Sequence, residues 1–107
     1  MPMLDGQVAL ITGAAGDLGN AMAVRLAREG AAVVMLDVLS ESKAAEQITR
    51  VNESALVPAR YLQVDVRERA AVDDAIANLE RLDIVCSNAG VVEPSSFLDV
   101  TLECWQY

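Results

Sequence analysis

A glycine-rich stretch near the N-terminus has the residue types and spacing that phosphate binding requires. It reads TGAAGDLG at residues 12–19, between an apolar run at 8–11 and a segment rich in helix formers at 21–29. This context predicts a strand, a tight turn and a helix. A dinucleotide pyrophosphate needs such an arrangement, because small residues let the backbone approach the phosphates and the helix N-terminus presents free N–H groups.

Individual residues of this stretch have distinct expected roles. Gly13 turns the chain sharply out of the strand, Gly16 lies where the backbone must come close to phosphate, and Gly19 permits close packing of helix on strand. The backbone N–H groups of Asp17 and Leu18 are the predicted phosphate donors. The alternative is a strand-to-helix turn that binds no ligand.

Asp37 directly follows the next apolar run, at residues 32–36. Its carboxylate is placed to accept hydrogen bonds from the hydroxyls of an adenosine ribose, and it would repel a phosphate on the ribose 2′ position. No Arg or Lys stands in the glycine-rich stretch or directly after Asp37 to neutralise such a phosphate. The sequence therefore predicts NAD in preference to NADP. The alternative is a strand-end aspartate that only stabilises a turn.

The elements that must position these residues alternate between strand and helix. Apolar runs predict strands at 8–11, 32–36, 61–64 and 84–86, and helical spacing predicts helices at about 18–29, 41–51 and 72–79. A fourth helix is expected to begin at Thr101, with only its first turn present. Right-handed crossovers then predict a parallel sheet with helices on both faces. The residues predicted to face inward are Leu18, Ala21, Met22 and Leu26, then Ala44, Ile48 and Val51, then Val72, Ala75, Ile76 and Leu79.

Composition indicates one small globular domain and argues against several classes of protein. The 107 residues are 53% hydrophobic with a net charge of −8, and no basic face suited to nucleic acid is visible. Two cysteines without a histidine predict neither a disulfide framework nor a zinc site, so no metal is expected. No export signal and no apolar run of about 20 residues is visible, so no membrane association and a cytoplasmic location are expected.

With these residues considered together, the chain resembles the short-chain dehydrogenase/reductase family, from about Gln7 to Trp105. The resemblance covers the N-terminal, cofactor-binding half of such an enzyme. It implies an α/β fold, namely the first half of a Rossmann-type doubly wound parallel sheet, with strand order 3-2-1-4 and a truncated fourth helix. Residues 1–107 would then form a partial NAD-binding domain.

The resemblance also assigns roles at two later strand ends. In the family, Asp65 and Val66 border the adenine ring: the carboxylate accepts from the exocyclic amine, and the Val66 backbone pairs with the ring. Asn88, Ala89 and Gly90 correspond to the family's N-N-A-G, with serine in place of its first Asn. Small residues there leave room for the cofactor ribose, and the Asn side chain can tie the strand end to its neighbours. Each group on its own is also compatible with an ordinary turn.

The glycine spacing departs from the compact branch of the family, T-G-x-x-x-G-x-G, which would have glycine at position 17. Asp17 stands there instead, and the pattern matches the T-G-x-x-G-x-x-G of the extended branch. An acid in the first helical turn suits the helix dipole. It also places a negative charge near the pyrophosphate, which predicts lowered cofactor affinity unless Asp17 points to solvent.

The resemblance implies an oxidoreductase that interconverts an alcohol and a carbonyl by hydride transfer. The family uses a Y-x-x-x-K pair with a serine ahead of it, and the tyrosine acts as general acid and base. The only lysine here, Lys43, has Leu39 at the position of that tyrosine. No catalytic residue is therefore assigned, and the chain alone is expected to be inactive.

Two other functions stay open from the sequence. One is a non-catalytic dinucleotide-binding module or an inactive truncated product. The other is a Rossmann-like methyltransferase that uses S-adenosylmethionine, whose fold also has a glycine loop and acids after its second and third strands. Residues 88–90 and the glycine spacing argue against the methyltransferase.

Two kinds of partner are expected. A C-terminal half would add the site for a small alcohol or carbonyl substrate. In the family order a fifth strand lies beside the fourth, so in the isolated chain residues 84–86 would form an exposed edge with apolar flanks. Because unpaired strand edges invite pairing with another chain, self-association or marginal stability is expected.

Overall fold

The computed structural model describes residues 3–90 and 97–103, which are organised around one parallel sheet. Its strands are β1 (Val8–Thr12), β2 (Ala32–Asp37), β3 (Arg60–Gln63) and β4 (Ile84–Cys86). Their order in the sheet is β3-β2-β1-β4, which confirms the predicted order 3-2-1-4. All three strand pairings are parallel, so the carboxyl ends of the strands meet at one edge of the sheet.

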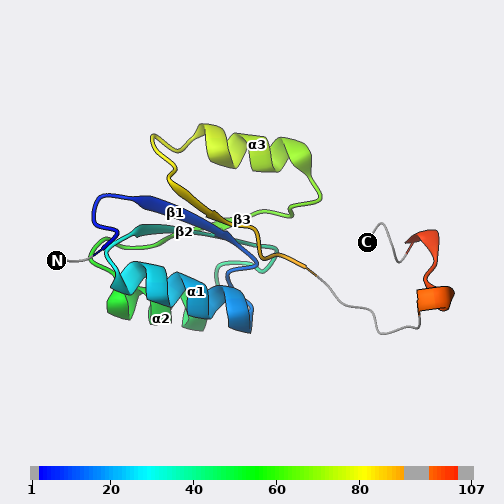
Figure 1. Ribbon diagram of the computed structural model, residues 1–107, viewed down its shortest axis with the longest axis horizontal. Helices are drawn as coiled ribbons and strands as arrows, with labels where there is room; N and C mark the ends of the chain where they lie inside the picture. The colour runs from blue at the N-terminus through cyan, green and yellow to red at the C-terminus, as the bar shows by residue number, and fades with distance from the viewer. Residues whose placement is uncertain (1–2, 91–96, 104–107) are drawn as a thin grey trace.

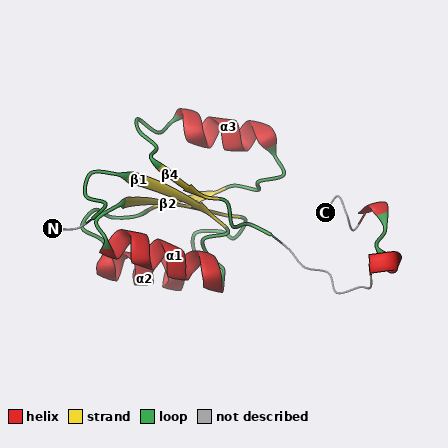
Figure 2. Ribbon diagram, in the orientation of Figure 1, coloured by secondary structure: helices red, strands yellow, loops and turns green. Residues whose placement is uncertain are grey.

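Helices cover both faces of this sheet, as Figures 1 and 2 show. The helices α1 (Asp17–Arg28) and α2 (Ala45–Ser54) lie on one face, and α3 (Arg69–Ala77) lies on the other. A short 3-10 turn, η1 (Phe97–Asp99), precedes helical backbone at residues 102–103. Beyond residue 103, the fourth helix expected from Thr101 falls outside the described residues. No helix within 3–90 or 97–103 has the length and apolarity needed to cross a membrane.

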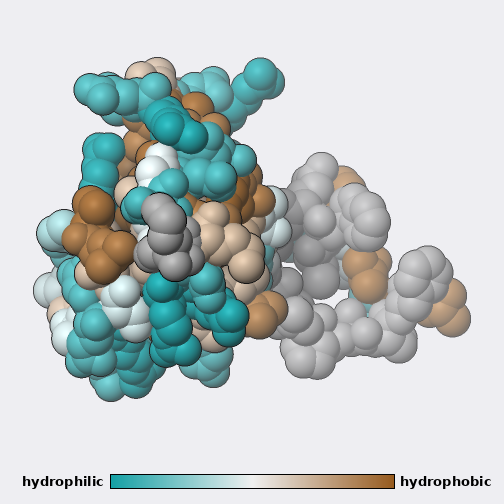
Figure 3. All heavy atoms as spheres, turned by 60° about the vertical axis from the view of Figure 1, so that its left-hand side comes forward, coloured by the Kyte–Doolittle hydropathy of each residue, from teal (hydrophilic) through white to brown (hydrophobic). Residues whose placement is uncertain are grey.

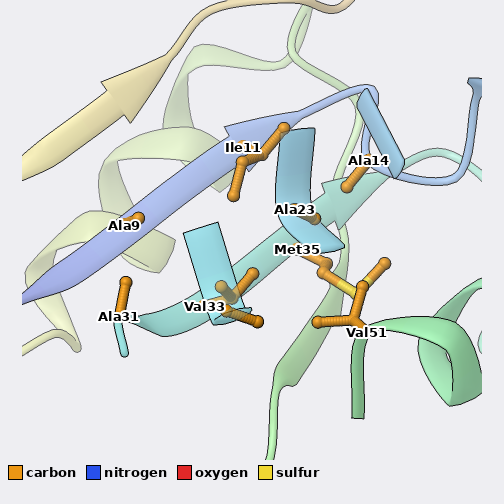
Figure 4. Packing of buried hydrophobic residues seen from close by; sticks show 9 residues of the cluster. Ala9, Ile11, Ala14, Ala23, Ala31, Val33, Met35 and Val51 are labelled. Carbon is orange, nitrogen blue, oxygen red and sulfur yellow. The ribbon is translucent and has the colours of Figure 1, made fainter. Parts of the chain in front are cut away.

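Alternate residues of β1 and β2 belong to two apolar clusters, one on each face of the sheet. Ile11, Val33 and Met35 pack with Ala23 of α1 and Val51 of α2, as Figure 4 shows. The smaller cluster, on the α3 face, centres on Leu10, Val34 and Leu36. The two central strands are nearly continuous apolar runs because both of their faces are covered. In the view of Figure 3, hydrophilic residues cover the outer helical layers and hydrophobic residues show between them.

The inward face of α1 differs from the predicted one. Gly19, Ala23 and Ala27 are buried, whereas Leu18 is 66% exposed. Ala21 is also exposed, and Met22 and Leu26 are only partly buried. The reason is the close approach of α1 to the sheet, which leaves room only for small side chains on the line of contact and places larger ones at its flanks.

The other two helices also differ in detail. Ile48 and Val51 of α2 face the core as predicted, and so does Ala44 just before the helix. The helix begins at Ala45 and not at 41, because residues 41–44 form a turn. In α3, Ala75 is buried and Leu79 is partly buried, but Ile76 is 43% exposed. That helix ends at Ala77, so residues beyond it no longer follow the helical spacing used in the prediction.

Candidate functional site

A cleft of about 740 Å³ lies where the strands end. This volume falls within the range of about 300–1,000 Å³ that is common for small-molecule sites. All of the site residues proposed from the sequence line it: Gly13, Gly16, Asp17, Leu18, Gly19, Asp37, Asp65, Val66, Asn88, Ala89 and Gly90. Leu36, Val38, Val64 and Arg67 complete the lining. The parallel sheet brings these groups together because each follows the carboxyl end of a different strand.

The turn after β1 depends on two glycines. Gly13 has φ +66°, a left-handed conformation that glycine adopts without steric cost. A Cβ on Gly19 would overlap the carbonyl oxygen of Gly13 and would lie 2.8 Å from Nδ2 of Asn88. Gly19 therefore lets α1 start directly against the turn and the β4 end, which agrees with its expected packing role.

The start of α1 presents unused donors to the cleft. The N-cap residue is Gly16, which has no side chain to cap the helix. Within the described residues, the backbone N–H groups of Asp17 and Leu18 donate to no acceptor. Such groups at a helix N-terminus are normally satisfied by a cap, by water or by a ligand, and the helix dipole favours an anion there.

The Asp37 carboxylate faces the glycine-rich turn. Its Oδ2 accepts a hydrogen bond from the backbone N–H of Ala15 at 2.9 Å. Its Oδ1 accepts from the backbone N–H of Leu39 at 3.3 Å. A carboxylate has about four lone-pair sites, so Asp37 keeps acceptor capacity for a ligand while it holds the turn.

Thr12 is a structural residue of the site that the sequence analysis did not single out. Its buried Oγ1 accepts hydrogen bonds from the backbone N–H groups of Asn88 at 2.9 Å and Ala89 at 3.0 Å. The Asn88 side chain donates in return from Nδ2 to the carbonyl of Thr12 at 3.4 Å. The expectation that Asn88 ties its strand end to a neighbour agrees with this contact. Two signals could have indicated its role: its position at the end of an apolar run and its place as the first residue of the T-G-x-x-G-x-x-G motif.

Asp65 is engaged by an arginine that the sequence analysis also did not consider. Nη2 of Arg67 lies 2.8 Å from Oδ2 of Asp65, and the backbone N–H of Arg67 donates to Oδ1 at 2.9 Å. The Arg67 side chain, followed by its backbone N–H, holds the pKa of the Asp65 carboxyl below its usual value. The carboxylate is therefore ionised at neutral pH, and a cation stands at this end of the cleft.

Comparisons with known proteins agree with this geometry. The family model for short chain dehydrogenases matches residues 7–107. AacuN, a short chain dehydrogenase/reductase of Aspergillus aculeatus, is 44% identical over 104 residues, which cover 94% of this chain and 39% of that protein. The chain therefore belongs to the short chain dehydrogenase family, and it spans about two fifths of the length of such curated relatives.

Solved structures of this family share the fold. Carveol dehydrogenase from Mycobacterium avium, in complex with NAD, superimposes with a TM-score of 0.81 at 32% identity, covering 99% of this chain and 44% of that one. A short chain dehydrogenase from Mycobacterium paratuberculosis, bound to NAD, has a TM-score of 0.79 at 36% identity, covering 96% and 44%. The family assignment disfavours the methyltransferase alternative.

Proposed function

We propose that this chain binds NAD(H) in the cleft at the strand ends and forms the cofactor-binding part of an alcohol–carbonyl oxidoreductase. The observation that carries the proposal is the convergence of unused helix N–H donors, the Asp37 carboxylate and the turn at 88–90 on one cleft. The NAD bound to the two solved relatives supports the same assignment.

The pyrophosphate would bind at the start of α1. The backbone N–H groups of Asp17 and Leu18 would donate to its oxygens, and the positive end of the helix dipole would stabilise its charge. A Cβ on Gly16 would meet only the Gly13 carbonyl oxygen, at 3.4 Å, so the protein itself leaves room for a side chain there. In this proposal a ligand, and not the fold, requires glycine at this position.

The adenosine half would bind between Asp37 and Asp65. The Asp37 carboxylate would accept from the ribose hydroxyls and repel a 2′-phosphate, which gives a preference for NAD over NADP. The Asp65 carboxylate would accept from the adenine amine, and the Val66 backbone would pair with the ring. Arg67 also lines the cleft, and its guanidinium is paired with Asp65.

The second ribose and the nicotinamide would lie over the turn of Asn88, Ala89 and Gly90. Thr12 and Asn88 hold this turn against the end of β1, so the cleft keeps its shape before a ligand arrives. When bound, NAD(H) accepts or donates the hydride. The chain supplies binding and orientation, and the proton-transfer residues would have to come from outside its 107 residues.

The test is calorimetric titration of the purified chain with NAD⁺, NADP⁺ and S-adenosylmethionine. We expect NAD⁺ to bind most tightly of the three. Asp37→Asn removes the charge but keeps an oxygen that can accept from the Ala15 N–H, so it should reduce the difference in affinity between NAD⁺ and NADP⁺. Asp37→Ala should reduce this difference too, and it should also weaken binding of both cofactors because the glycine-rich turn loses its hydrogen bond to Asp37. Tighter binding of NADP⁺ or S-adenosylmethionine by the unaltered chain would overturn the proposal.

A non-catalytic dinucleotide-binding module is the second candidate. It would have the same cleft, so cofactor binding alone does not separate it from the oxidoreductase. The two candidates separate when a longer reading frame containing this chain is sought and assayed for alcohol oxidation. Turnover that depends on a Y-x-x-x-K pair beyond residue 107 would support the oxidoreductase.

A further inference from the structure

The segment that follows Asp37 is held from the edge of the sheet by two side chains of β3. The phenol of Tyr61 donates to the backbone carbonyl of Leu39 at 2.6 Å. Nε2 of Gln63 donates to the backbone carbonyl of Val38 at 3.1 Å. Both side chains bridge more than twenty positions of sequence to reach neighbouring peptides of one short segment, residues 38–39, which we call the ribose-side segment.

The positions of these two residues follow from the strand register. Tyr61 pairs with Met35 and Gln63 with Asp37, so both point to the same face of β3. Tyr61 packs against the apolar cluster that contains Val51 of α2, which identifies this face as the α1–α2 side of the sheet. The ribose-side segment crosses that side on its way from β2 to α2, directly within reach of both donors.

These contacts continue into the glycine-rich turn. Leu39 donates its backbone N–H to Oδ1 of Asp37, and Oδ2 of Asp37 accepts from Ala15. The network therefore runs from Tyr61 and Gln63, through the ribose-side segment and Asp37, to the turn before α1. It has two consequences: the Asp37 carboxylate is oriented, and the Leu39 N–H, a donor that a 2′-phosphate could use, is already occupied.

We propose that Tyr61 and Gln63 are positioning residues that enforce the preference for NAD over NADP by holding the ribose-side segment. The proposal rests on the proposed function, since it deepens the cofactor preference of the same cleft. Asp37 and Val38 line the cleft, whereas Tyr61 and Gln63 do not line it and act through the ribose-side segment. With both donors in place, the cleft presents a fixed carboxylate and an apolar side chain beside the adenosine ribose.

The chemical state of Tyr61 is compatible with this role. Burial, followed by the nearby carboxylates of Asp37 and Glu41, raises the pKa of Tyr61 to about 12. The phenol therefore remains a hydrogen-bond donor throughout the neutral range.

Dissociation constants for NAD⁺ and NADP⁺ measured on Tyr61→Phe, Gln63→Leu and the double variant test the proposal. Each single change should weaken NAD⁺ binding about threefold and leave NADP⁺ binding unchanged or stronger, and the double variant should narrow the preference about tenfold, as expected for neutral hydrogen bonds. Amide hydrogen exchange at Leu39 and Ala15 should accelerate in the same variants, without any cofactor present.

The matched control is Asn52→Leu, which removes another bond between a side chain and a distant backbone group. Oδ1 of Asn52 accepts from the N–H of Ala59 at 2.8 Å, just before the opposite end of β3. This control should lower thermal stability but keep the wild-type cofactor ratio. Variants of Tyr61 and Gln63 that keep the wild-type ratio would overturn this proposal while leaving the proposed function intact. An unaltered chain that binds no NAD⁺, or does not discriminate, would overturn both.

Discussion

Replacement of Gly19 by alanine should destabilise the fold, because the added Cβ has no space. It would overlap the carbonyl oxygen of Gly13 and would lie 2.8 Å from both the Gly13 carbonyl carbon and Nδ2 of Asn88. Two of these three atoms are backbone, and Asn88 is tied to Thr12, so none can move without displacing the turn or the β4 end.

The magnitude follows from two opposing terms. Overpacking of this kind costs about 1–3 kcal/mol, and the backbone contacts place Gly19→Ala at the upper end. Alanine is favoured over glycine within a helix by about 0.5–1 kcal/mol, which offsets part of the cost. The net loss is about 2 kcal/mol, or about 8–16 °C in Tm for a domain of this size.

Gly16→Ala is the matched control, because its Cβ would meet only one protein atom, at 3.4 Å. It should cost less than about 1 kcal/mol, the scale of a helix-cap change, yet weaken NAD⁺ binding at least about tenfold by filling the cleft. Urea unfolding at low protein concentration and calorimetry measure the two effects. A Gly19→Ala variant as stable as the unaltered chain would refute the close approach of α1, and a Gly16→Ala variant with full affinity would refute the pyrophosphate position.

Four further outcomes are expected. Asp17→Gly should strengthen NAD⁺ binding severalfold in calorimetry, most at low salt, because it removes a negative charge beside the proposed pyrophosphate position; equal affinities at every ionic strength would contradict this. The Arg81 side chain, followed by a backbone N–H of β1, holds the pKa of the Asp83 carboxyl below its usual 3.8. The contribution of this carboxylate to the free energy of unfolding is present above pH 3.8 and is lost as the pH falls through the lower folded-state pKa. When the free energy of unfolding is measured against pH, it should therefore fall less steeply in acid for Asp83→Asn than for the unaltered chain. The purified chain should show no alcohol or carbonyl turnover with NAD(H) in a spectrophotometric assay, and activity free of contaminating enzyme would disprove that. The chain should also self-associate through the β4 edge, where Val85 is 58% exposed, and light scattering that shows a monodisperse monomer at all concentrations would argue otherwise.

Local sequence patterns predicted the alternating strands and helices of this protein and its glycine-rich turn. The resemblance to the family supplied the strand order and the roles expected at residues 65–66 and 88–90. Strands and helices alternate with clear periodicity, and each polar or glycine-rich motif directly follows an apolar run. Because the carboxyl ends of parallel strands meet at one edge, motifs far apart in the chain had to converge once the sheet was parallel. Gly13, Asp37, Asp65 and Asn88 therefore line one cleft, as their positions after strands predicted.

Spacing was less informative about which side of a helix is buried. Leu18 and Ile76 fit an apolar stripe, yet Leu18 is largely exposed and Ile76 is 43% exposed, while Gly19 and Ala23 occupy the contact with the sheet. Periodicity identifies the apolar face of a helix but does not report the distance between the helix and the sheet on which it packs. That distance, short beneath α1, selects small side chains over larger apolar ones.

Only the tertiary structure decided which groups complete the site. The hydroxyl of Thr12 reaches backbone N–H groups 76 and 77 positions away, and Tyr61 reaches a carbonyl 22 positions away. Neither bond leaves a periodic signal in the sequence, because a hydrogen bond depends on the direction of two groups after the strands have paired. The sequence by itself determined where a dinucleotide could bind, and the packed sheet determined which side chains fix the geometry of that cleft through hydrogen bonds.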